Sequence, residues 1–326
     1  MINRRTFSGL AATAALALGL SASATLAQEN GELVYMTPGL DLAFWRYVSE
    51  GVRNVAEENG YGFSALDSTN DPQTQLQNAQ DAIARGVAGI ILSPTDSSTA
   101  PAVLDLAQQA GIPVVIADIG TDSGEFVSVI GSNNYEGANG VGQALAEAMQ
   151  AEGKEGGSIG IVGISQARLN GQARTQGFKD AVTEAGITGD AGLQQMQAYT
   201  ADETFRFTQD MITANPQMTG MFVQTDGPTL GALRAIKAAR MDGEILVGAF
   251  DGIPEFVPLL QSGELVVSGM QQPYLMGQRS AEAMVEHLSG GTPEKEITVP
   301  ILIVTSENID EQLDTIRETV FANELE

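Results

Sequence analysis

The sequence of 326 residues predicts an α/β protein with two lobes, each built around a doubly wound parallel sheet. Short runs rich in Val, Ile and Leu alternate with amphipathic segments along the chain, which is typical of buried parallel strands joined by helices. The alternation stops at the polar segment 131–134 (GSNN) and then begins again. Because the chain is too long for one ordinary core, the two successive sets of elements predict two similar lobes.

The first set of elements occupies residues 32–130. Its clearest helix is predicted to begin after Asp71, whose carboxylate can accept hydrogen bonds from the free N–H groups of the first turn. Pro72 suits the first helical position, and Gly86 is expected to end this helix. The complete prediction for this set is strands 32–37, 63–66, 89–93, 112–117 and 126–130, and helices 41–59, 72–85 and 99–110.

The second set of elements follows residues 131–134. Its strongest strand signal is the run 245–250 (ILVGAF), which is short, apolar and stopped abruptly by Asp251 and Gly252. The last stretch, 307–321, carries apolar residues at helical spacing. The complete prediction for this set is helices 138–150, 172–185, 203–214, 228–239, 275–288 and 307–321, and strands 158–164, 193–199, 220–224, 245–250, 265–269 and 297–304.

Acidic residues lie just past the ends of several of these strands. Asp118 follows strand 112–117, Asp251 follows strand 245–250, and Asp96 and Asp226 come shortly after strands 89–93 and 220–224. In open α/β sheets ligands bind at this carboxyl edge, so several carboxylates there predict a polar cleft. A single acid in this position usually caps the next helix, and this is the role we expect for Asp96 and Asp226.

The composition excludes several functional classes. The formal charge of −25 at pH 7 repels nucleic acid phosphates and anionic lipid, so we expect no nucleic acid partner. The chain has no cysteine and one histidine, His287, which leaves no thiolate or multi-histidine metal site. It also lacks the glycine-rich phosphate-binding motifs of nucleotide-dependent enzymes. We therefore expect no metal and no cofactor.

Residues 1–27 are predicted to be a cleaved export signal. Arg4 and Arg5 form a basic start, a small-residue apolar stretch follows, and residues 25–27 (TLA) fit a cleavage site. The paired arginines also fit a twin-arginine signal, so both export routes stay open. Loss of the signal changes the formal charge from −25 to −27. The mature protein is expected outside the cytoplasm, in the periplasm.

Several motifs, taken in this order, resemble those of the ribose-type periplasmic sugar-binding proteins, the solute receptors of sugar ABC transporters. The resemblance covers the whole mature chain. Its carriers are Phe44-Trp45, residues 66–97 (LDSTNDPQTQLQNAQDAIARGVAGIILSPTDS), 112–118 (IPVVIAD), 129–138 (VIGSNNYEGA), 174–178 (RTQGF), 220–236 (GMFVQTDGPTLGALRAI), 247–252 (VGAFDG) and 270–273 (MQQP).

This resemblance implies the type I periplasmic-binding fold, in which a hinge of three crossovers joins two lobes that close over one small neutral sugar or polyol. It implies that lobe one comprises about 30–132 and 272–300, and lobe two about 133–271 and 301–326. The implied partner is the membrane permease of an ABC transporter. A chemoreceptor or sensor kinase remains an alternative or additional partner, and a monomer is expected.

The resemblance also assigns the cleft residues, none of them catalytic. Phe44, Trp45 and Tyr199 match the family's aromatic residues, which pack against the sugar's C–H faces. Asp118 and Asp251 match its two hydroxyl-accepting carboxylates. The remaining matches are Arg174, which donates to sugar oxygens, Gln271, a cleft amide beside a crossover, and Thr225, which stands where the family has asparagine.

Each assignment has an ordinary structural alternative. Phe44 and Trp45 point about 100° apart on a helix, and core packing is the alternative for either one. If the two aspartates do not bind the ligand, they are solvated strand ends. The corresponding alternatives are that Arg174 is a surface residue and that Gln271 packs at the hinge. We further expect Arg174 and Asp251 to meet at one sheet edge, where the arginine would keep the carboxylate ionised.

The sequence departs from the ribose-receptor pattern at several polar positions. Pro38, Leu42, Ile119 and Thr225 replace polar partners of the sugar. Burying a hydroxyl without a partner costs roughly 1–3 kcal/mol, which argues against ribose itself as the ligand. The replacement partners left open are Asp41, Gln166, Arg168 and Asn170.

Two other functions fit parts of the sequence less well. A serine hydrolase would use Ser165, Asp251 and His287 in the chain order of that fold, but the second glycine of the nucleophile motif is missing. A transcriptional repressor's effector domain shares the fold but needs a basic DNA-binding segment, and an export signal stands in its place.

Overall fold

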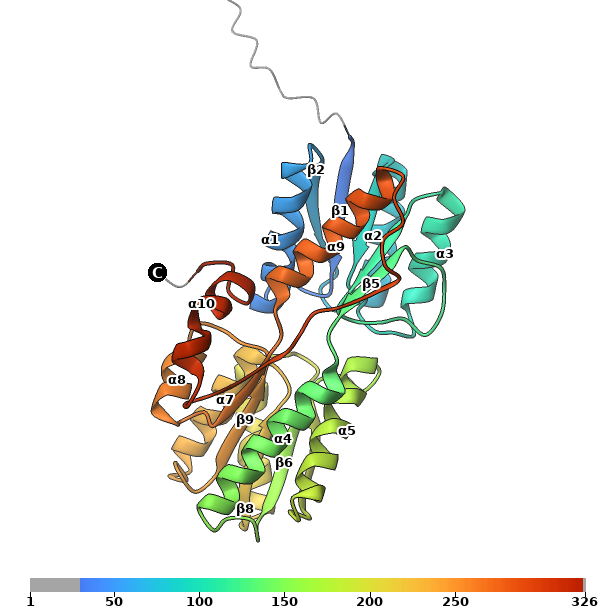
Figure 1. Ribbon diagram of the computed structural model, residues 1–326. Coiled ribbons are helices and arrows are strands. Elements are labelled where there is room, and N and C mark those ends of the chain that lie inside the picture. Colours follow the sequence, from blue (N-terminus) through green and yellow to red (C-terminus); the bar gives the residue numbers. More distant parts are fainter. Residues whose placement is uncertain (1–29, 325–326) are drawn as a thin grey trace, which may run out of the picture.

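The computed structural model describes residues 30–324 as two α/β lobes, each with a six-stranded sheet between layers of helices (Figure 1). The predicted export signal lies outside the described residues. Among residues 30–324, no helix combines the length and the hydrophobicity needed to cross a bilayer.

The sheet of lobe one has the strand order β11-β5-β4-β3-β1-β2, and all its strands are parallel. Successive residues of β1 point to opposite faces: Leu33 and Tyr35 pack with α1 and α9, whereas Val34 and Met36 pack with α2 and α3. Burial of both faces explains the continuous apolar runs. The elements are β1 (Glu32–Thr37), α1 (Ala43–Glu58), β2 (Gly62–Asp67), α2 (Pro72–Arg85), β3 (Gly89–Leu92), α3 (Ala100–Ala110), β4 (Val114–Ala117), β5 (Ser128–Gly131), α9 (Pro273–Leu288) and β11 (Glu296–Thr298).

The sheet of lobe two has the order β12-β10-β9-β8-β6-β7, with β12 antiparallel to β10 and the other pairs parallel. Helices α4 and α5 cover one face, and α6, α7 and α10 cover the other. The elements are α4 (Asn134–Ala151), β6 (Ser158–Gly163), α5 (Leu169–Glu184), β7 (Gly189–Gln195), α6 (Ala201–Ala214), β8 (Met218–Val223), α7 (Asp226–Ala238), β9 (Leu246–Phe250), α8 (Phe256–Ser262), β10 (Val267–Met270), β12 (Leu302–Thr305) and α10 (Ile309–Thr319).

The chain passes between the two sheets three times: after β5, after β10, and between β11 and β12. The predicted single strand 297–304 is therefore wrong. Its first part pairs with β5 in lobe one and its last part with β10 in lobe two. Pro300 lies between the two parts and lacks the N–H that a continuous strand would need.

Two further predictions of secondary structure are corrected. The strand predicted at 193–199 runs instead from Gly189 to Gln195, so Tyr199 lies in the following loop with a φ of 54°. Helix α8 was not predicted, because Pro254 and Pro258 interrupt its helical pattern.

Helix caps test the predicted helix ends directly. Asp71 is confirmed as the N-cap of α2, because its carboxylate accepts a hydrogen bond from the Thr74 N–H at 2.6 Å, and Gly86 ends this helix with a φ of 69°. The capping roles predicted for Asp96 and Asp226 are wrong. Asp96 accepts from the N–H of Ser98 and Thr99 in the turn before α3, and Asp226 is already the first residue of α7.

Candidate ligand-binding cleft

Two aspartates mark the carboxyl ends of β4 and β9, one in each lobe. Asp118 and Asp251 both adopt left-handed backbone conformations, with φ angles of 66° and 63°. Each N–H donates to the neighbouring strand: Asp118 to the Ile130 carbonyl at 2.8 Å, and Asp251 to the Gly269 carbonyl at 2.9 Å. This conformation is uncommon for residues other than glycine, although aspartate tolerates it. The two lobes thus hold their carboxylates by the same backbone arrangement.

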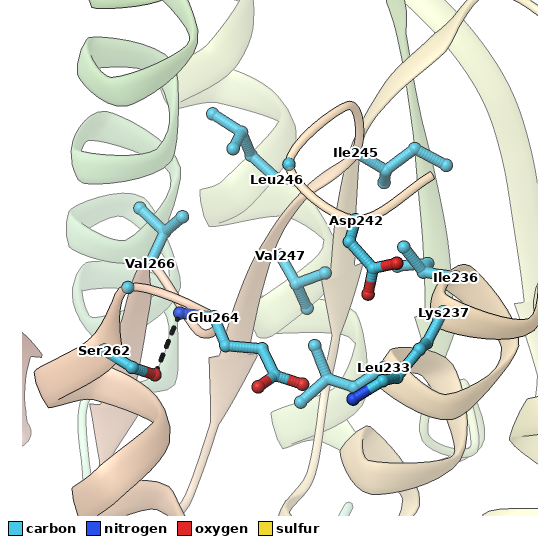
Figure 2. A pocket seen from close by; sticks show the side chains of 12 residues that line it. Leu233, Ile236, Lys237, Asp242, Ile245, Leu246, Val247, Ser262, Glu264 and Val266 are labelled. Carbon is cyan, nitrogen blue, oxygen red and sulfur yellow. Dashed lines mark hydrogen bonds between the residues drawn. The ribbon is translucent and has the colours of Figure 1, made fainter. Parts of the chain in front are cut away.

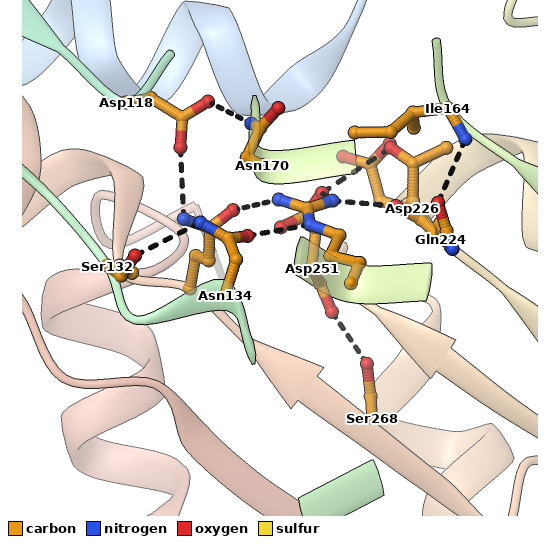
Figure 3. A network of polar contacts seen from close by, with 12 residues as sticks. Asp118, Ser132, Asn134, Ile164, Asn170, Gln224, Asp226, Asp251 and Ser268 are labelled. Carbon is orange, nitrogen blue, oxygen red and sulfur yellow. Dashed lines mark hydrogen bonds and ion pairs between the residues drawn. The ribbon is translucent and has the colours of Figure 1, made fainter. Parts of the chain in front are cut away.

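Arg174, on α5, is buried and is the centre of a polar network. Figure 3 shows this network, with Asn134, Gln224 and Asp251 labelled among its members. Its Nε donates to Asn134 Oδ1 at 2.7 Å, and Nη1 donates to the Gln224 carbonyl at 2.6 Å and to Asp251 Oδ2 at 3.1 Å. Nη2 donates to Gln271 Oε1. A buried ion pair is tolerated when further hydrogen bonds satisfy both partners, and this network supplies them to the arginine.

Asp118 connects the two lobes across the cleft. Its Oδ1 accepts a hydrogen bond from Gln271 Nε2 at 3.0 Å, and its Oδ2 accepts one from Asn170 Nδ2 at 3.1 Å. Asn170 lies on α5 of lobe two, whereas Asp118 follows a strand of lobe one. The polar side chains of the two lobes therefore contact one another directly.

Burial sets the protonation of the cleft carboxyls. It raises the pKa of Asp251 to about 7, although the Arg174 guanidinium beside it opposes the change. Burial likewise raises the pKa of Asp118, again against the effect of Arg174, and that of Asp226. The expectation that Arg174 keeps Asp251 ionised is thus corrected, because desolvation outweighs the nearby charge.

Three buried carboxyl or amide oxygen atoms in this region have no hydrogen-bond partner among residues 30–324. They are Asn170 Oδ1, Asp226 Oδ2 and Asp251 Oδ1, on residues that are only 7%, 1% and 4% exposed. Asn170 and Asp251 line a cavity of about 20 Å³ together with Asp118 and Arg174. Buried acceptors of this kind call for a donor, so the arrangement can receive hydroxyl groups.

The predicted aromatic residues lie around the same cavity. Phe44 and Trp45 begin α1 and meet edge to face, with ring centroids 4.7 Å apart. Both are also part of the core of lobe one, so the cleft and the core share them. Tyr199 accepts a hydrogen bond from the Ser165 N–H at 3.0 Å, and the guanidinium of Arg168 lies over its ring.

The structure brings seven of the eight predicted residues to one cavity. The eighth, Gln271, contacts Arg174 and Asp118 directly but does not line it. Thr225 is close to Asp251, with Oγ1 3.4 Å from its Oδ2. The seven residues that line the cavity are Phe44, Trp45, Asp118, Arg174, Tyr199, Thr225 and Asp251.

The structure also shows which of the four possible replacement partners line the cavity. Asn170 and Arg168 line the cavity, but Gln166 is engaged by the Ile164 carbonyl and by Thr175, and Asp41 is exposed at the mouth of the cleft. The predicted start of α5 at 172 left Asn170 outside the helix, which begins at Leu169, so the sequence named it only as one of four open partners. Asn134 was missed, although it lies in the polar GSNN segment.

The residues of the hydrolase alternative do not assemble. His287 is exposed on α9 and makes no hydrogen bond to Ser165 or Asp251. Within residues 30–324, no group of three or more His, Asp or Glu side chains could hold a metal ion.

Comparison with known proteins agrees with this architecture. The ribose import binding protein of Escherichia coli is 30% identical over 306 residues, which cover 94% of this chain and 100% of that protein. The D-apiose import binding protein of Actinobacillus succinogenes is 30% identical over 297 residues, covering 89% and 94%. A carbohydrate transporter solute binding protein from Agrobacterium radiobacter, solved in complex with D-arabinose, shares the fold with a TM-score of 0.83 at 24% identity, covering 90% and 99%.

The family model described as a periplasmic binding protein domain matches residues 33–292, which include every cleft residue named above. Because this match spans most of the chain and the relatives extend over nearly all of it, the chain belongs to the periplasmic binding protein family.

Proposed function

We propose that the protein captures a small neutral sugar or polyol between its two lobes and delivers it to the permease of an ABC importer. The observation that carries this proposal is the pair of unpartnered buried acceptors at Asn170 and Asp251, which line one cavity with a satisfied arginine and aromatic rings. Hydroxyl groups satisfy such acceptors, and rings cover the C–H faces of a sugar. Relatives named as import binding proteins for ribose and apiose support the same class of ligand.

The proposed roles of the side chains follow from their chemistry. Asp118 and Asp251 accept sugar hydroxyls, Arg174 orients Asp251, and Asn170 adds an acceptor that the family pattern did not supply. Thr225 and Gln271 hold the carboxylates in place. Phe44, Trp45 and Tyr199 provide the apolar walls.

The proposed lobes are 30–132 with 272–300, and 133–271 with 301–326. The membership of the two sheets supports these boundaries, since β1–β5 and β11 pair with one another and β6–β10 and β12 pair with one another. The three segments between the sheets would then be the hinge. Ligand binding would change the angle between the lobes through these few residues.

The location and the partners extend this proposal. The protein is periplasmic by family, and residues 1–27 would be the cleaved signal, with either export route open. A monomer is sufficient, because one chain carries both walls of the cleft. Presentation of the loaded protein to a chemoreceptor or sensor kinase remains a second role for the same binding event.

A thermal-shift screen against pentoses, hexoses, deoxysugars and polyols tests the proposal. A ligand that binds only the native state raises the melting temperature by mass action. At least one neutral sugar or polyol should do so, and native mass spectrometry should recover it unchanged. Stabilisation by none of them, or conversion of a bound sugar, would overturn the proposal.

A further inference from the structure

A second, larger pocket lies between the lobes at the mouth of the cleft. It has a volume of about 460 Å³, within the range of small-molecule sites. Segments 38–42 and 67–70 of lobe one form one wall, and Arg168 with segment 197–199 of lobe two forms the other. We refer to it as the rim pocket.

The rim pocket is continuous with the cavity at the paired aspartates. Leu42, Trp45, Arg168 and Tyr199 line both spaces, so no further layer of residues separates them. The inner cavity has only about 20 Å³, little more than one water molecule needs. Most of the space that these walls enclose therefore lies on the rim side.

We propose that the rim pocket is a second subsite, which holds a neutral substituent on the bound sugar, such as the second ring of a disaccharide. This inference rests on the proposed function, because the first ring must be anchored at Asp118 and Asp251. It extends the ligand class from free monosaccharides to neutral glycosides.

Arg168 supplies the polar anchor of the subsite. The residue is 5% exposed, and it donates from Nε to the Thr95 carbonyl at 2.8 Å and from Nη2 to Asn70 Oδ1 at 2.7 Å. Its Nη1 has no hydrogen-bond partner and the side chain forms no ion pair within the described part of the chain. This leaves a charged donor atom on the wall of the pocket, on a residue that is largely buried, and hydrogen bonds from charged donors to sugar oxygens are strong.

The remaining walls favour a neutral substituent. Two carboxylates, Asp41 and Asp67, face the pocket against the single guanidinium, which disfavours an anionic group. Both oxygens of Asp67 already accept backbone hydrogen bonds, from the N–H of Leu40 and of Thr69, whereas the Asp41 side chain is exposed at the mouth and can accept hydroxyls. Trp45 and Tyr199 supply apolar surface for a second ring.

The closed arrangement of the lobes is compatible with an occupied rim pocket. Arg168 already reaches Thr95 and Asn70 across the cleft, and the Leu169 N–H donates to Ser97 Oγ at 3.2 Å. The rim pocket exists while these contacts are formed, so a substituent there does not itself require the lobes to separate, whereas the inner cavity of about 20 Å³ must widen to take the first ring.

The test compares each free sugar with larger versions of itself. Calorimetry would measure D-ribose, D-arabinose, D-allose, D-glucose and D-galactose, their methyl glycosides, and disaccharides that carry the same sugar at the non-reducing end. For the sugar that binds best, we expect at least one disaccharide or glycoside to bind as tightly as the free sugar or more tightly. Ala198→Trp fills the rim pocket from an exposed position that does not line the inner cavity.

Ala198→Trp should weaken disaccharide binding by at least about tenfold, while the affinity for the free sugar should change by no more than about twofold. The matched control is Glu264→Trp, in a pocket of about 320 Å³ at the opposite, amino-terminal ends of β9 and β10 (Figure 2). It should change neither affinity.

The outcomes separate the inference from the function on which it rests. Binding of free sugars with exclusion of every glycoside and disaccharide would overturn the rim subsite and leave the proposed function intact. Equal weakening of both ligand classes by Ala198→Trp would also overturn it, because the pocket would then not be a distinct subsite. Binding of none of these ligands, together with no stabilisation by any sugar or polyol in the thermal-shift screen, would overturn both.

Discussion

Arg168 of lobe two donates a hydrogen bond to Oδ1 of Asn70 of lobe one, at 2.7 Å across the mouth of the cleft. Its Nε reaches a second lobe-one atom, the Thr95 carbonyl, at 2.8 Å. Asn70 has a left-handed backbone with a φ of 54°, which a small polar residue tolerates. One buried arginine thus holds two loops of the opposite lobe, and we expect these contacts to break when the lobes separate.

Arg168→Met should therefore weaken the binding of every free sugar by a similar factor, on the order of tenfold. The reason is that the variant removes hydrogen bonds of the closed state rather than a contact to one hydroxyl. Calorimetry with several bound sugars measures this, and small-angle scattering at saturating ligand should show a larger fraction of open molecules. A loss confined to one sugar would instead make Arg168 a recognition residue of the inner site. Unchanged affinity for all of them would show that the hydrogen bonds of Arg168 to Asn70 and Thr95 do not stabilise the closed lobes.

Asp251→Asn keeps the shape of the side chain but removes its charge. Above pH 7, where the Asp251 carboxyl is ionised, we expect sugar affinity to fall by about ten- to several-hundred-fold, because hydrogen bonds to a charged acceptor are lost and the hydrogen bond from Arg174 loses its charged acceptor. Calorimetry provides the measurement, with Asp190→Asn as an exposed control whose lysine contact lies on the surface. Normal affinity in Asp251→Asn would show that the ligand does not contact this carboxylate.

The pH dependence of stability should also depend on Asp251. Burial raises its pKa from 3.8 to about 7, so the native state holds the proton more tightly than the unfolded chain does. The resulting stabilisation is fully present below about pH 4 and is lost as the pH rises towards 7. The melting temperature of the wild type relative to Asp251→Asn should therefore fall between pH 4 and pH 7. A constant difference would indicate that the carboxyl is hydrated in solution.

Helix packing in lobe one gives an independent test of the fold. A Cβ added at Gly51 on α1 would lie 2.2 Å from the Tyr274 carbonyl oxygen of α9, so the two helices must separate. Gly51→Ala should lower the free energy of unfolding by about 1–3 kcal/mol. Gly227, at the start of α7, has nothing within 4 Å of such an atom, so Gly227→Ala should not destabilise the protein. Denaturant unfolding of both variants decides the matter.

Local pattern predicted most of the fold, because the strands buried on both faces are short apolar runs that end at polar residues. β9 and Asp251 illustrate this. It failed where one apolar run serves two sheets, as at 297–304, since the pairing of β11 with β5 and of β12 with β10 depends on tertiary structure.

The contacts of the cleft could not be predicted from local sequence patterns, for a related reason. Asn170 and Asp118 are hydrogen-bonded although they lie 52 positions apart in the sequence, and Gln271 and Arg174 are hydrogen-bonded although they lie 97 positions apart. Periodicity and capping signals report on neighbours a few residues away. Only the resemblance to a family could place these side chains together beforehand, and it could not rank Asn170 and Arg168 among the four possible replacement partners.

Trp45 should act as an intrinsic reporter of ligand binding. It is the single tryptophan of the chain, it is 4% exposed, and it lines both the inner cavity and the rim pocket. A sugar packed against this ring replaces water, and movement of lobe two changes the distance to Arg168 and Tyr199. The emission of Trp45 should therefore change on addition of sugar and saturate at the concentration at which calorimetric heat saturates.

Trp45→Phe separates the reporter from the binding surface. The phenyl ring keeps an apolar wall but is smaller, so we expect sugar affinity to fall by only about three- to tenfold while the emission signal disappears. Calorimetry measures the affinity without the fluorophore. Because Phe44 packs edge to face against Trp45, a matched Phe44→Leu variant should retain the signal and shift its midpoint. Wild-type emission that stays constant at a sugar concentration shown to be saturating would place the ligand away from Trp45, and with it away from both the inner cavity and the rim pocket.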